Sequence, residues 1–312
     1  MNILLTGGSS FTGLWFAEAL AAQGLHVIAP LRGRAADYAG LRGERVRRLG
    51  KTAEIIEACP FGGDAFLDVM RGGEVDALCH HAAQVKDYKR PDFDALDALE
   101  ENTRNLPRVL DAGQKLRAVI LTGSVFEADA GRGTEPREAF SPYGLSKTLT
   151  AQVFRYWCAK IVLPFTRFII PNPFGPYEEP RFCDYLLKCW KDGQAATVKT
   201  PDYVRDNVPV SLLAKAYADG VKRALEGEAV PHIAPSFYAE TQIAFAHRMS
   251  RELAPRLGLP CAVEAVTQAD FAEPLVRINT DETDVFRLEW NEKAAWDELA
   301  SYYRAAYLKQ EN

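Results

Sequence analysis

The 312-residue sequence has no run of apolar residues long enough to cross a membrane, and its start shows no basic stretch followed by an apolar one. These absences argue against a transmembrane segment and against a signal peptide. The sequence also has no excess of positive charge, since 42 acidic side chains outnumber 37 Lys and Arg and give a net charge of −5. We therefore expect neither nucleic acid nor a membrane as a partner.

The six cysteines form no Cys-x-x-Cys pair and show no spacing typical of metal ligands. Known zinc sites and redox motifs usually show such patterns in the sequence. We therefore predict reduced thiols in a cytoplasmic protein, and no bound metal.

The first half of the chain contains a regular alternation of short apolar segments and amphipathic segments. This order is typical of parallel strands joined by helices, so we predict an α/β fold with a Rossmann-type doubly wound parallel sheet. Ligands of such sheets bind beyond the carboxyl ends of the strands. The predicted strands cover residues 2–6, 25–29, 77–79, 116–122 and 165–170, and the predicted helices cover residues 12–24, 65–71, 93–112 and 143–160.

A cluster of prolines from Pro171 to Pro180 marks a change in organisation, because proline interrupts both helices and sheets. We place a domain boundary there, with a first domain over residues 1–170 and a smaller mixed α/β domain over residues 171–312. Residues 205–228 are expected to pack back on the first domain. Within the second domain, helices are predicted over residues 182–190, 211–225, 241–253 and 292–308, and strands over residues 196–199 and 261–266.

A glycine-rich turn, TGGSSFTG at residues 6–13, follows the first predicted strand. A strand, a tight turn and a helix start together present backbone N–H groups that can bind a pyrophosphate. The usual middle glycine of such a loop is replaced by Ser10. Taken alone, the stretch is also compatible with an ordinary turn between a strand and a helix.

The end of the second predicted strand, IAPLRGR, carries Arg32 and Arg34 and no acid. Dinucleotide-binding folds that use NAD usually place an acid here for the ribose hydroxyls. Arginines can instead bind the 2′-phosphate of NADP. The pattern favours NADP and leaves NAD possible, and either arginine alone is also compatible with a solvated loop.

Tyr143 and Lys147 are four residues apart on a predicted helix, so their side chains share one face. A lysine ammonium close to a phenol favours the phenolate. Such a tyrosine can exchange a proton with a sugar hydroxyl or carbonyl near neutral pH.

These motifs together resemble the extended short-chain dehydrogenases/reductases, the NAD(P)-dependent nucleotide-sugar epimerases, dehydratases and reductases. The matching segments, in order, are TGGSSFTG at 6–13, GDAFL at 63–67, DALCHHAA at 76–83, Asn102, LTGSVF at 121–126, YGLSK at 143–147, RFIIPNPFGP at 167–176 and VRDNVPVSLLA at 204–214.

The resemblance implies a Rossmann domain followed by a substrate-binding domain, and a homodimer formed through a four-helix bundle from residues 93–112 and 143–160. It implies Tyr143 as the catalytic acid/base and Lys147 as its partner. The cofactor residues implied or inferred from the motifs are Gly7, Ser9, Ser10, Phe11, Thr12, Gly13, Arg32, Arg34, Asp64, Ala82, Ala83, Lys147 and Pro171, and the substrate residues are Lys86, Tyr88, Asn172, Arg181 and Arg205.

The family also places a catalytic Ser or Thr at the end of the strand before Tyr143, and here either Thr122 or Ser124 can fill that role. The nucleotide-sugar 4,6-dehydratases carry Thr-Asp-Glu at this point, whereas this chain has Thr-Gly-Ser. The nearest acids, Glu127 and Asp129, stand further along.

We therefore predict NADPH-dependent reduction of a nucleotide-linked 4-keto-(6-deoxy) sugar, with Tyr143 as the proton donor. The alternative is an NAD-dependent nucleotide-sugar 4-epimerase. A 4,6-dehydratase and a non-catalytic dinucleotide-binding protein are less favoured. The nucleotide base and the sugar stay open.

Overall fold

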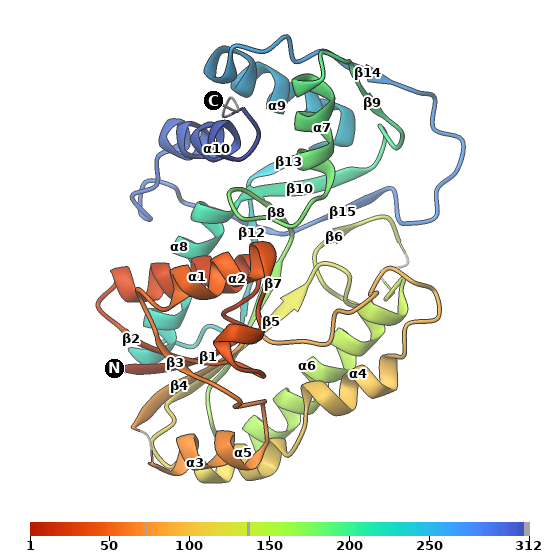
Figure 1. Cartoon of the computed structure of the whole chain (residues 1–312). Helices are drawn as coiled ribbons and strands as arrows, with labels where there is room; N and C mark the ends of the chain where they lie inside the picture. Colours follow the sequence, from red (N-terminus) through yellow and green to blue (C-terminus); the bar gives the residue numbers. More distant parts are fainter. Residues whose placement is uncertain (73, 136–137, 309–312) are drawn as a thin grey trace. The chain divides into compact units, whose positions relative to one another are not determined.

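The computed structural model describes residues 1–72, 74–135 and 138–308 (Figure 1). The chain forms two compact units. Unit 1 contains residues 1–130, 137–170 and 214–234, and unit 2 contains residues 131–136, 171–213 and 235–312. No helix in the described part of the chain is long and apolar enough to span a membrane.

The centre of unit 1 is a seven-stranded sheet in the order β11-β7-β5-β4-β1-β2-β3. All of its strand pairs are parallel. The predicted Rossmann-type parallel sheet is therefore confirmed. Its strands are β1 (Asn2–Thr6), β2 (His26–Pro30), β3 (Glu54–Ile56), β4 (Val75–His80), β5 (Ala118–Ser124), β7 (Phe165–Ile170) and β11 (His232–Ile233).

Helices cover both faces of this sheet, as Figure 1 shows. One face packs against α3 (Asp64–Gly72), α5 (Leu106–Ala112) and α6 (Pro142–Lys160) in a core that includes Leu78 and Leu121. On the other face, Phe16 of α1 (Phe11–Ala22) stacks on Tyr217 of α8 (Val210–Leu225), with ring centroids 4.0 Å apart. The burial of these apolar side chains is the main driving force that holds the layers together.

The helix predicted over residues 93–112 is wrong as one continuous element. The structure has α4 (Ala95–Asn102) and α5, separated by a turn in which Asn105 has a φ of 52°. Pro107 lies in the first turn of α5, where its missing N–H costs no hydrogen bond. Thus the proline starts a second helix.

Three elements between β2 and α3 were not predicted. The basic loop after β2 contains a short 3₁₀ turn, η1 (Ala35–Asp37), and a helix, α2 (Gly40–Leu49). The short strand β3 then joins the edge of the sheet beside β2. Only a few residues of α2 are buried, and its many arginines leave no clear amphipathic pattern in the sequence.

Unit 2 is built around a mixed sheet in the order β13-β10-β15-β6, with β8 paired to β10. Its core includes Phe174, Trp190, Phe245 and Trp296. The sheet strands are β6 (Arg132–Gly133), β8 (Asn172–Phe174), β10 (Val204–Pro209), β13 (Tyr238–Thr241) and β15 (Val276–Ile278). Two further two-stranded sheets pair β9 (Ala196–Val198) with β14 (Val263–Ala265) and β12 (Pro235–Ser236) with β16 (Asp281–Glu282). The helices are α7 (Phe182–Lys191), α9 (Gln242–Leu257) and α10 (Glu292–Tyr307).

Candidate active site

The glycine-rich turn connects β1 to α1 and is packed against the end of β4. A Cβ atom on Gly7 would lie 2.8 Å from the Ala82 nitrogen, and one on Gly13 would lie 2.2 Å from the Gly7 carbonyl oxygen. Gly7 also has a φ of 75°, which side chains rarely tolerate. Both glycines are therefore required for this backbone path.

Ser10, which replaces the middle glycine, caps α1. Its Oγ accepts a hydrogen bond from the Gly13 amide at 3.1 Å and lies 3.0 Å from Nε2 of His81. The Oγ1 of Thr12 also lies 3.0 Å from this ring nitrogen. Burial and the nearby Lys147 lower the pKa of His81 to about 3, so the ring is neutral near pH 7. Ser10 thus gives the turn a side-chain anchor that glycine cannot provide.

These features fit a dinucleotide. The turn is free of side chains at its two tightest points and leads into a 12-residue helix whose first N–H groups favour an anion. Ser9, Phe11 and Thr12 are buried around it. Ala82 and Ala83 follow β4, and Ala82 lies directly beside the turn.

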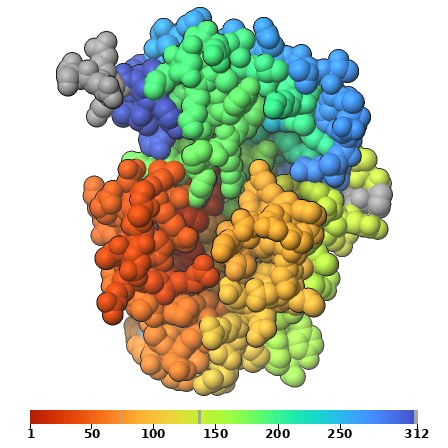
Figure 2. Space-filling model, turned by 45° about the vertical axis from the view of Figure 1, so that its right-hand side comes forward, coloured from red at the N-terminus to blue at the C-terminus, as the bar shows by residue number. Residues whose placement is uncertain are grey.

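The end of β2 carries basic side chains. Leu31 is buried after the strand, whereas Arg32 and Arg34 are exposed. The Arg32 guanidinium pairs with Glu101 of α4 at 3.5 Å, which links segments that lie side by side on the surface in Figure 2, red-orange and gold. Asp64, predicted to contact the adenine, is exposed at the start of α3.

Arg42 is a basic residue that the sequence analysis missed. From α2, its Nε and Nη2 donate to Ser9 Oγ at 3.2 and 3.0 Å, and its guanidinium lies 5.2 Å from the centre of the Tyr38 ring. Because α2 was not predicted, the sequence gave no reason to place Arg42 near the turn. It adds a cation directly at the glycine loop.

Tyr143 lies in the first turn of α6 and is surrounded by aromatic rings. The ring centroids of Tyr88, Phe93 and Phe126 lie 5.1, 6.1 and 6.3 Å from that of Tyr143. The structure therefore brings the predicted substrate residue Tyr88 next to the predicted acid/base. Lys86, two residues earlier in the chain, is exposed.

Lys147 lies one helical turn after Tyr143 and is 4% exposed. Its Nζ donates to the carbonyl oxygen of Thr122 at 2.5 Å. Burial lowers the pKa of this lysine, Glu127 opposes that effect, and Arg167 adds to it. The charge of Lys147 is thus set by its buried surroundings.

The two candidate hydroxyls at the end of β5 have different environments. Thr122 Oγ1 is buried, near the buried phenol of Tyr217. Ser124 is partly exposed, and its Oγ accepts a hydrogen bond from the Phe126 amide at 3.2 Å. Ser124 is therefore linked to the ring of Tyr143 through Phe126.

A buried network supports the loop after β4. His80 Nε2 lies 3.1 Å from the Asn102 carbonyl oxygen, and the Asn102 side chain accepts a hydrogen bond from the Gln84 amide at 2.8 Å. The Asn102 amide group also donates to Thr150 of α6 at 3.3 Å. This network joins α4, α6 and the segment that leads to Tyr88.

Four predicted site residues belong to unit 2. Pro171 is buried, and Asn172 and Arg181 are exposed at the starts of β8 and α7. Arg205 of β10 pairs with Glu273 at 2.8 Å, and its guanidinium lies 4.6 Å from the centre of the Tyr203 ring. An anionic ligand at Arg205 would have to compete with the Glu273 carboxylate.

The family model described as the NAD dependent epimerase/dehydratase family matches residues 3–227, which include the glycine turn, Tyr143, Lys147 and Arg205. The chain belongs to this family. Members of the NAD dependent epimerase/dehydratase family are enzymes, so the predicted family and the prediction of an NAD(P)-dependent enzyme are both confirmed. The search of curated proteins found no match to this sequence.

Solved structures of similar fold cover almost the whole chain. UDP-glucuronic acid 4-epimerase from Bacillus cereus, in complex with UDP-glucuronic acid and NAD, has a TM-score of 0.72 at 18% identity, over 98% of this chain and 100% of that one. dTDP-glucose 4,6-dehydratase from Streptomyces venezuelae, with NAD and TYD bound, has a TM-score of 0.73 at 21% identity, over 100% and 99% of the two chains. At such identities the likeness establishes the fold.

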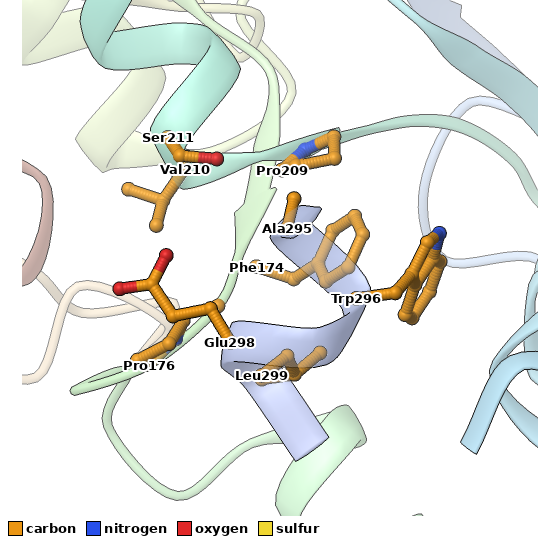
Figure 3. Close-up of a pocket in the computed structure, with 10 residues that line it drawn as sticks. Phe174, Pro176, Pro209, Val210, Ser211, Ala295, Trp296, Glu298 and Leu299 are labelled. Atoms are coloured by element: carbon orange, nitrogen blue, oxygen red, sulfur yellow. The ribbon is translucent and has the colours of Figure 1, made fainter. Parts of the chain in front are cut away.

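A small pocket in unit 2 is separate from the predicted site residues (Figure 3). It lies between the first turn of α8 and α10, where Val210 points toward Glu298. Its volume of about 10 Å³ admits little more than one water molecule. Among the described residues, no group of three or more His, Cys, Asp or Glu side chains is arranged to hold a metal ion.

Proposed function

We propose that this member of the family catalyses NADPH-dependent reduction of a nucleotide-linked 4-keto-(6-deoxy) sugar. The observation that carries the proposal is the group of basic side chains at the glycine turn and the end of β2. Arg42 donates to Ser9, Arg32 and Arg34 are exposed nearby, and Leu31 occupies the place where an acid would bind a ribose. Arginine side chains recognise a phosphate monoester such as the 2′-phosphate of NADP.

The cofactor would be held by Gly7 to Gly13 at its pyrophosphate and by Arg32, Arg34 and Arg42 at its 2′-phosphate. Asp64 would hold the adenine, Ala82, Ala83 and Pro171 would line the cofactor's path, and Lys147 would bind a ribose. When bound, NADPH supplies the reducing equivalent for the carbonyl carbon.

Tyr143 gives the proton that the new hydroxyl group requires. The ammonium group of Lys147, one turn away on the same helix, favours the phenolate that remains. Ser124 orients the substrate oxygen through its hydroxyl, and the Tyr88 ring holds the sugar beside the phenol. The 4-epimerases and the 4,6-dehydratase of similar fold suggest a nucleotide sugar as the substrate. The further residues that would bind it are Lys86, Asn172, Arg181 and Arg205.

Dehydration is disfavoured because the strand end carries Gly123 and Ser124 in place of the two acids. Glu127, the nearer of the two acids that follow, is fully buried and paired with Arg167. A carboxylate held in this way does not reach a substrate carbon.

An NAD-dependent 4-epimerase is the second candidate. The pairing of Arg32 with Glu101 reduces the positive charge at the end of β2, and several solved structures of similar fold are 4-epimerases. The same tyrosine and lysine serve that reaction as well.

The decisive experiment follows NADPH oxidation with a panel of nucleotide-linked 4-keto-6-deoxy sugars and identifies any dinucleotide that is released on denaturation. We expect NADPH oxidation and a protein purified largely free of cofactor. Stoichiometric bound NAD, together with no NADPH oxidation by any keto-sugar, would overturn the reductase in favour of the epimerase.

Replacing Tyr143 with Phe removes the proton donor while keeping the ring contacts. We expect kcat to fall by about 10²- to 10⁴-fold, with NADPH affinity unchanged. Tyr156→Phe, an exposed position on the same helix, is the matched control and should keep full activity. Unchanged turnover in Tyr143→Phe would exclude the acid/base role.

Replacing Arg42 with Ala tests the choice of cofactor. We expect NADPH to bind about tenfold more weakly and NADH affinity to change little, because a charged hydrogen-bond donor to the 2′-phosphate is lost. Fluorescence titration of both cofactors measures this difference. Arg71→Ala, at the end of α3, is the control, and an equal loss for NADPH and NADH in Arg42→Ala would contradict the assignment.

A further inference from the structure

The turn after β5 places a carboxylate in the interior of unit 1. Glu127 is 0% exposed. Its Oε1 accepts a hydrogen bond from the Ser124 amide at 2.7 Å, and its Oε2 accepts one from Nη2 of Arg167 at 2.5 Å. Arg167 comes from the neighbouring strand β7, and its side chain is 11% exposed. A buried ion pair therefore joins the turn after β5 to the middle of β7.

The Glu127 carboxylate lies in the space that a side chain at position 123 would occupy. A Cβ atom on Gly123 would lie 2.7 Å from Glu127 Oε1 and 2.6 Å from Cδ1 of Ile169. A residue other than glycine at position 123 would thus require the Glu127 carboxylate or the Ile169 side chain to shift. Gly123 and the buried Glu127 carboxylate are therefore packed against each other.

Lys147 is held at the same point of the backbone. Its Nζ donates to the carbonyl oxygen of Thr122, the residue that precedes Gly123. The negative charge of Glu127 raises the pKa of Lys147, and the positive charge of Arg167 lowers it. Among the described residues, His80 and His81 at the end of β4 also interact with Lys147, and both are neutral near pH 7 because burial lowers their pKa values to about 3.

The turn that carries Glu127 is fixed to α6 on both sides of the carboxylate. The Phe126 carbonyl oxygen would lie 2.2 Å from a Cβ atom on Gly144, which shows how closely the turn approaches the helix. The Ala128 amide donates to Thr148 Oγ1 at 2.9 Å. These contacts pack the turn that carries Glu127 against the same helix that carries Tyr143 and Lys147.

We propose that Glu127 is a positioning residue that keeps Lys147 protonated, and that Arg167 fixes the Glu127 carboxylate in place while opposing its charge. The catalytic consequence rests on the proposed function, since it assumes that Tyr143 needs a charged lysine. The electrostatic effect itself is a property of the protein without cofactor or substrate. A buried lysine with no anion near it tends to lose its proton, and the carboxylate counteracts this tendency.

The test follows Lys147 directly. The Cε chemical shift is recorded against pH in protein labelled with ¹³C-lysine, and the signal is assigned by its absence in Lys147→Met. We expect the midpoint of Lys147 to fall by about one pH unit or more in Glu127→Gln, where Arg167 acts alone. In the double variant Glu127→Gln/Arg167→Met, most of this shift should be recovered, because both charges are gone.

A purely structural role predicts a different pattern, since the double variant would then be at least as perturbed as the single one. An unchanged Lys147 midpoint in folded Glu127→Gln would overturn the proposal. If Glu127→Gln does not fold, Arg167→Met is compared with the double variant, because the two differ only in the acid or amide at position 127. A higher Lys147 midpoint in Arg167→Met supports the proposal, and equal midpoints overturn it.

This measurement is independent of the reductase assignment. A shifted lysine with no activity on keto-sugars would mean that the proposed function fails while the electrostatic role of Glu127 stands. Where activity is found, the alkaline limit of kcat/KM in Glu127→Gln should move to lower pH together with the lysine midpoint.

Discussion

His80 is a buried residue of the candidate active-site region whose hydrogen bonds require a neutral ring. It is 1% exposed, its Nδ1 lies 3.1 Å from Thr6 Oγ1, and its Nε2 lies 3.1 Å from the Asn102 carbonyl oxygen. Because a carbonyl oxygen accepts only, Nε2 carries the proton and donates to it, and Nδ1 accepts a hydrogen bond from the threonine hydroxyl. Burial, together with the positive charge of Lys147, lowers the pKa of the ring to about 3.

This low pKa predicts acid sensitivity. Between pH 6.5 and pH 3 the unfolded chain binds a proton at His80 that the folded chain does not, so stability falls as the pH falls through that range. One proton corresponds to about 1.4 kcal/mol per pH unit. We expect the free energy of unfolding, measured by urea titration at several pH values, to fall less steeply in His80→Gln than in the wild type.

His247→Gln in unit 2 is the matched control for this pH series. Its slope should equal that of the wild type. A His80→Gln variant as acid-sensitive as the wild type would show that another group causes the loss.

At the level of elements, α6 determines the geometry of the site. It begins at Pro142 with Ser141 as its cap and carries Tyr143, Gly144 and Lys147 in its first turns. Gly144 has no side chain because the Phe126 carbonyl oxygen occupies that space. The spacing of the YGLSK segment therefore reflects both the chemistry of its tyrosine and lysine and the close approach of the turn after β5.

We expect Gly144→Ala to push the turn after β5 away from α6. A Cβ atom 2.2 Å from a carbonyl oxygen forces the backbone to move, and overpacking of this kind typically costs about 1–3 kcal/mol. We expect a lower melting temperature and a loss of activity beyond that of the stability change, since Ser124 and Glu127 lie in the displaced turn. Calorimetry and kinetics on the same sample measure both effects.

Gly72→Ala is the control, because a Cβ atom there has no neighbour within 4 Å in the described part of the chain. It should leave the melting temperature unchanged or raise it slightly, since alanine favours a helix over glycine. Equal effects of the two substitutions would contradict the role assigned to Gly144.

The strands and α6 were predictable because each has a simple pattern. The apolar run of β7 and the helical spacing of α6 both appear in the sequence, and the glycine turn has a known geometric requirement. The parallel sheet follows from their order. In contrast, α2 is rich in arginine and half exposed, so no apolar period reveals it or the place of Arg42.

The positions of the candidate site residues were predictable where a sequence motif defines them. They were not predictable where tertiary packing determines them. Tyr143 and Lys147 follow from a four-residue spacing. That Glu127 turns inward to Arg167, 40 residues away, depends on the fold of β7 against β5, and no local pattern contains this information. The different burial of Thr122 and Ser124 likewise follows from the packing of α8 over the sheet.

At the scale of the whole molecule, the predicted homodimer has a specific candidate surface. Helices α4 and α6 pack together. Leu96 of α4 and Tyr156 of α6 are 70% and 59% exposed, and Ile161 and Val162 at the end of α6 are 51% and 89% exposed. Exposed apolar side chains concentrated on adjacent helices are typical of a surface that a partner covers. We propose that two copies bury these side chains in a four-helix arrangement.

Leu96→Glu combined with Tyr156→Glu should convert this dimer to a monomer. In a two-fold symmetric interface each substitution occurs twice, so four charges would be buried or brought close together. Sedimentation equilibrium at micromolar concentration measures the change. Phe286→Glu, at a 90% exposed position in unit 2, is the control and should leave the dimer intact. A wild-type monomer, or a dimer that persists in the double variant, would place the subunit contact elsewhere or exclude it.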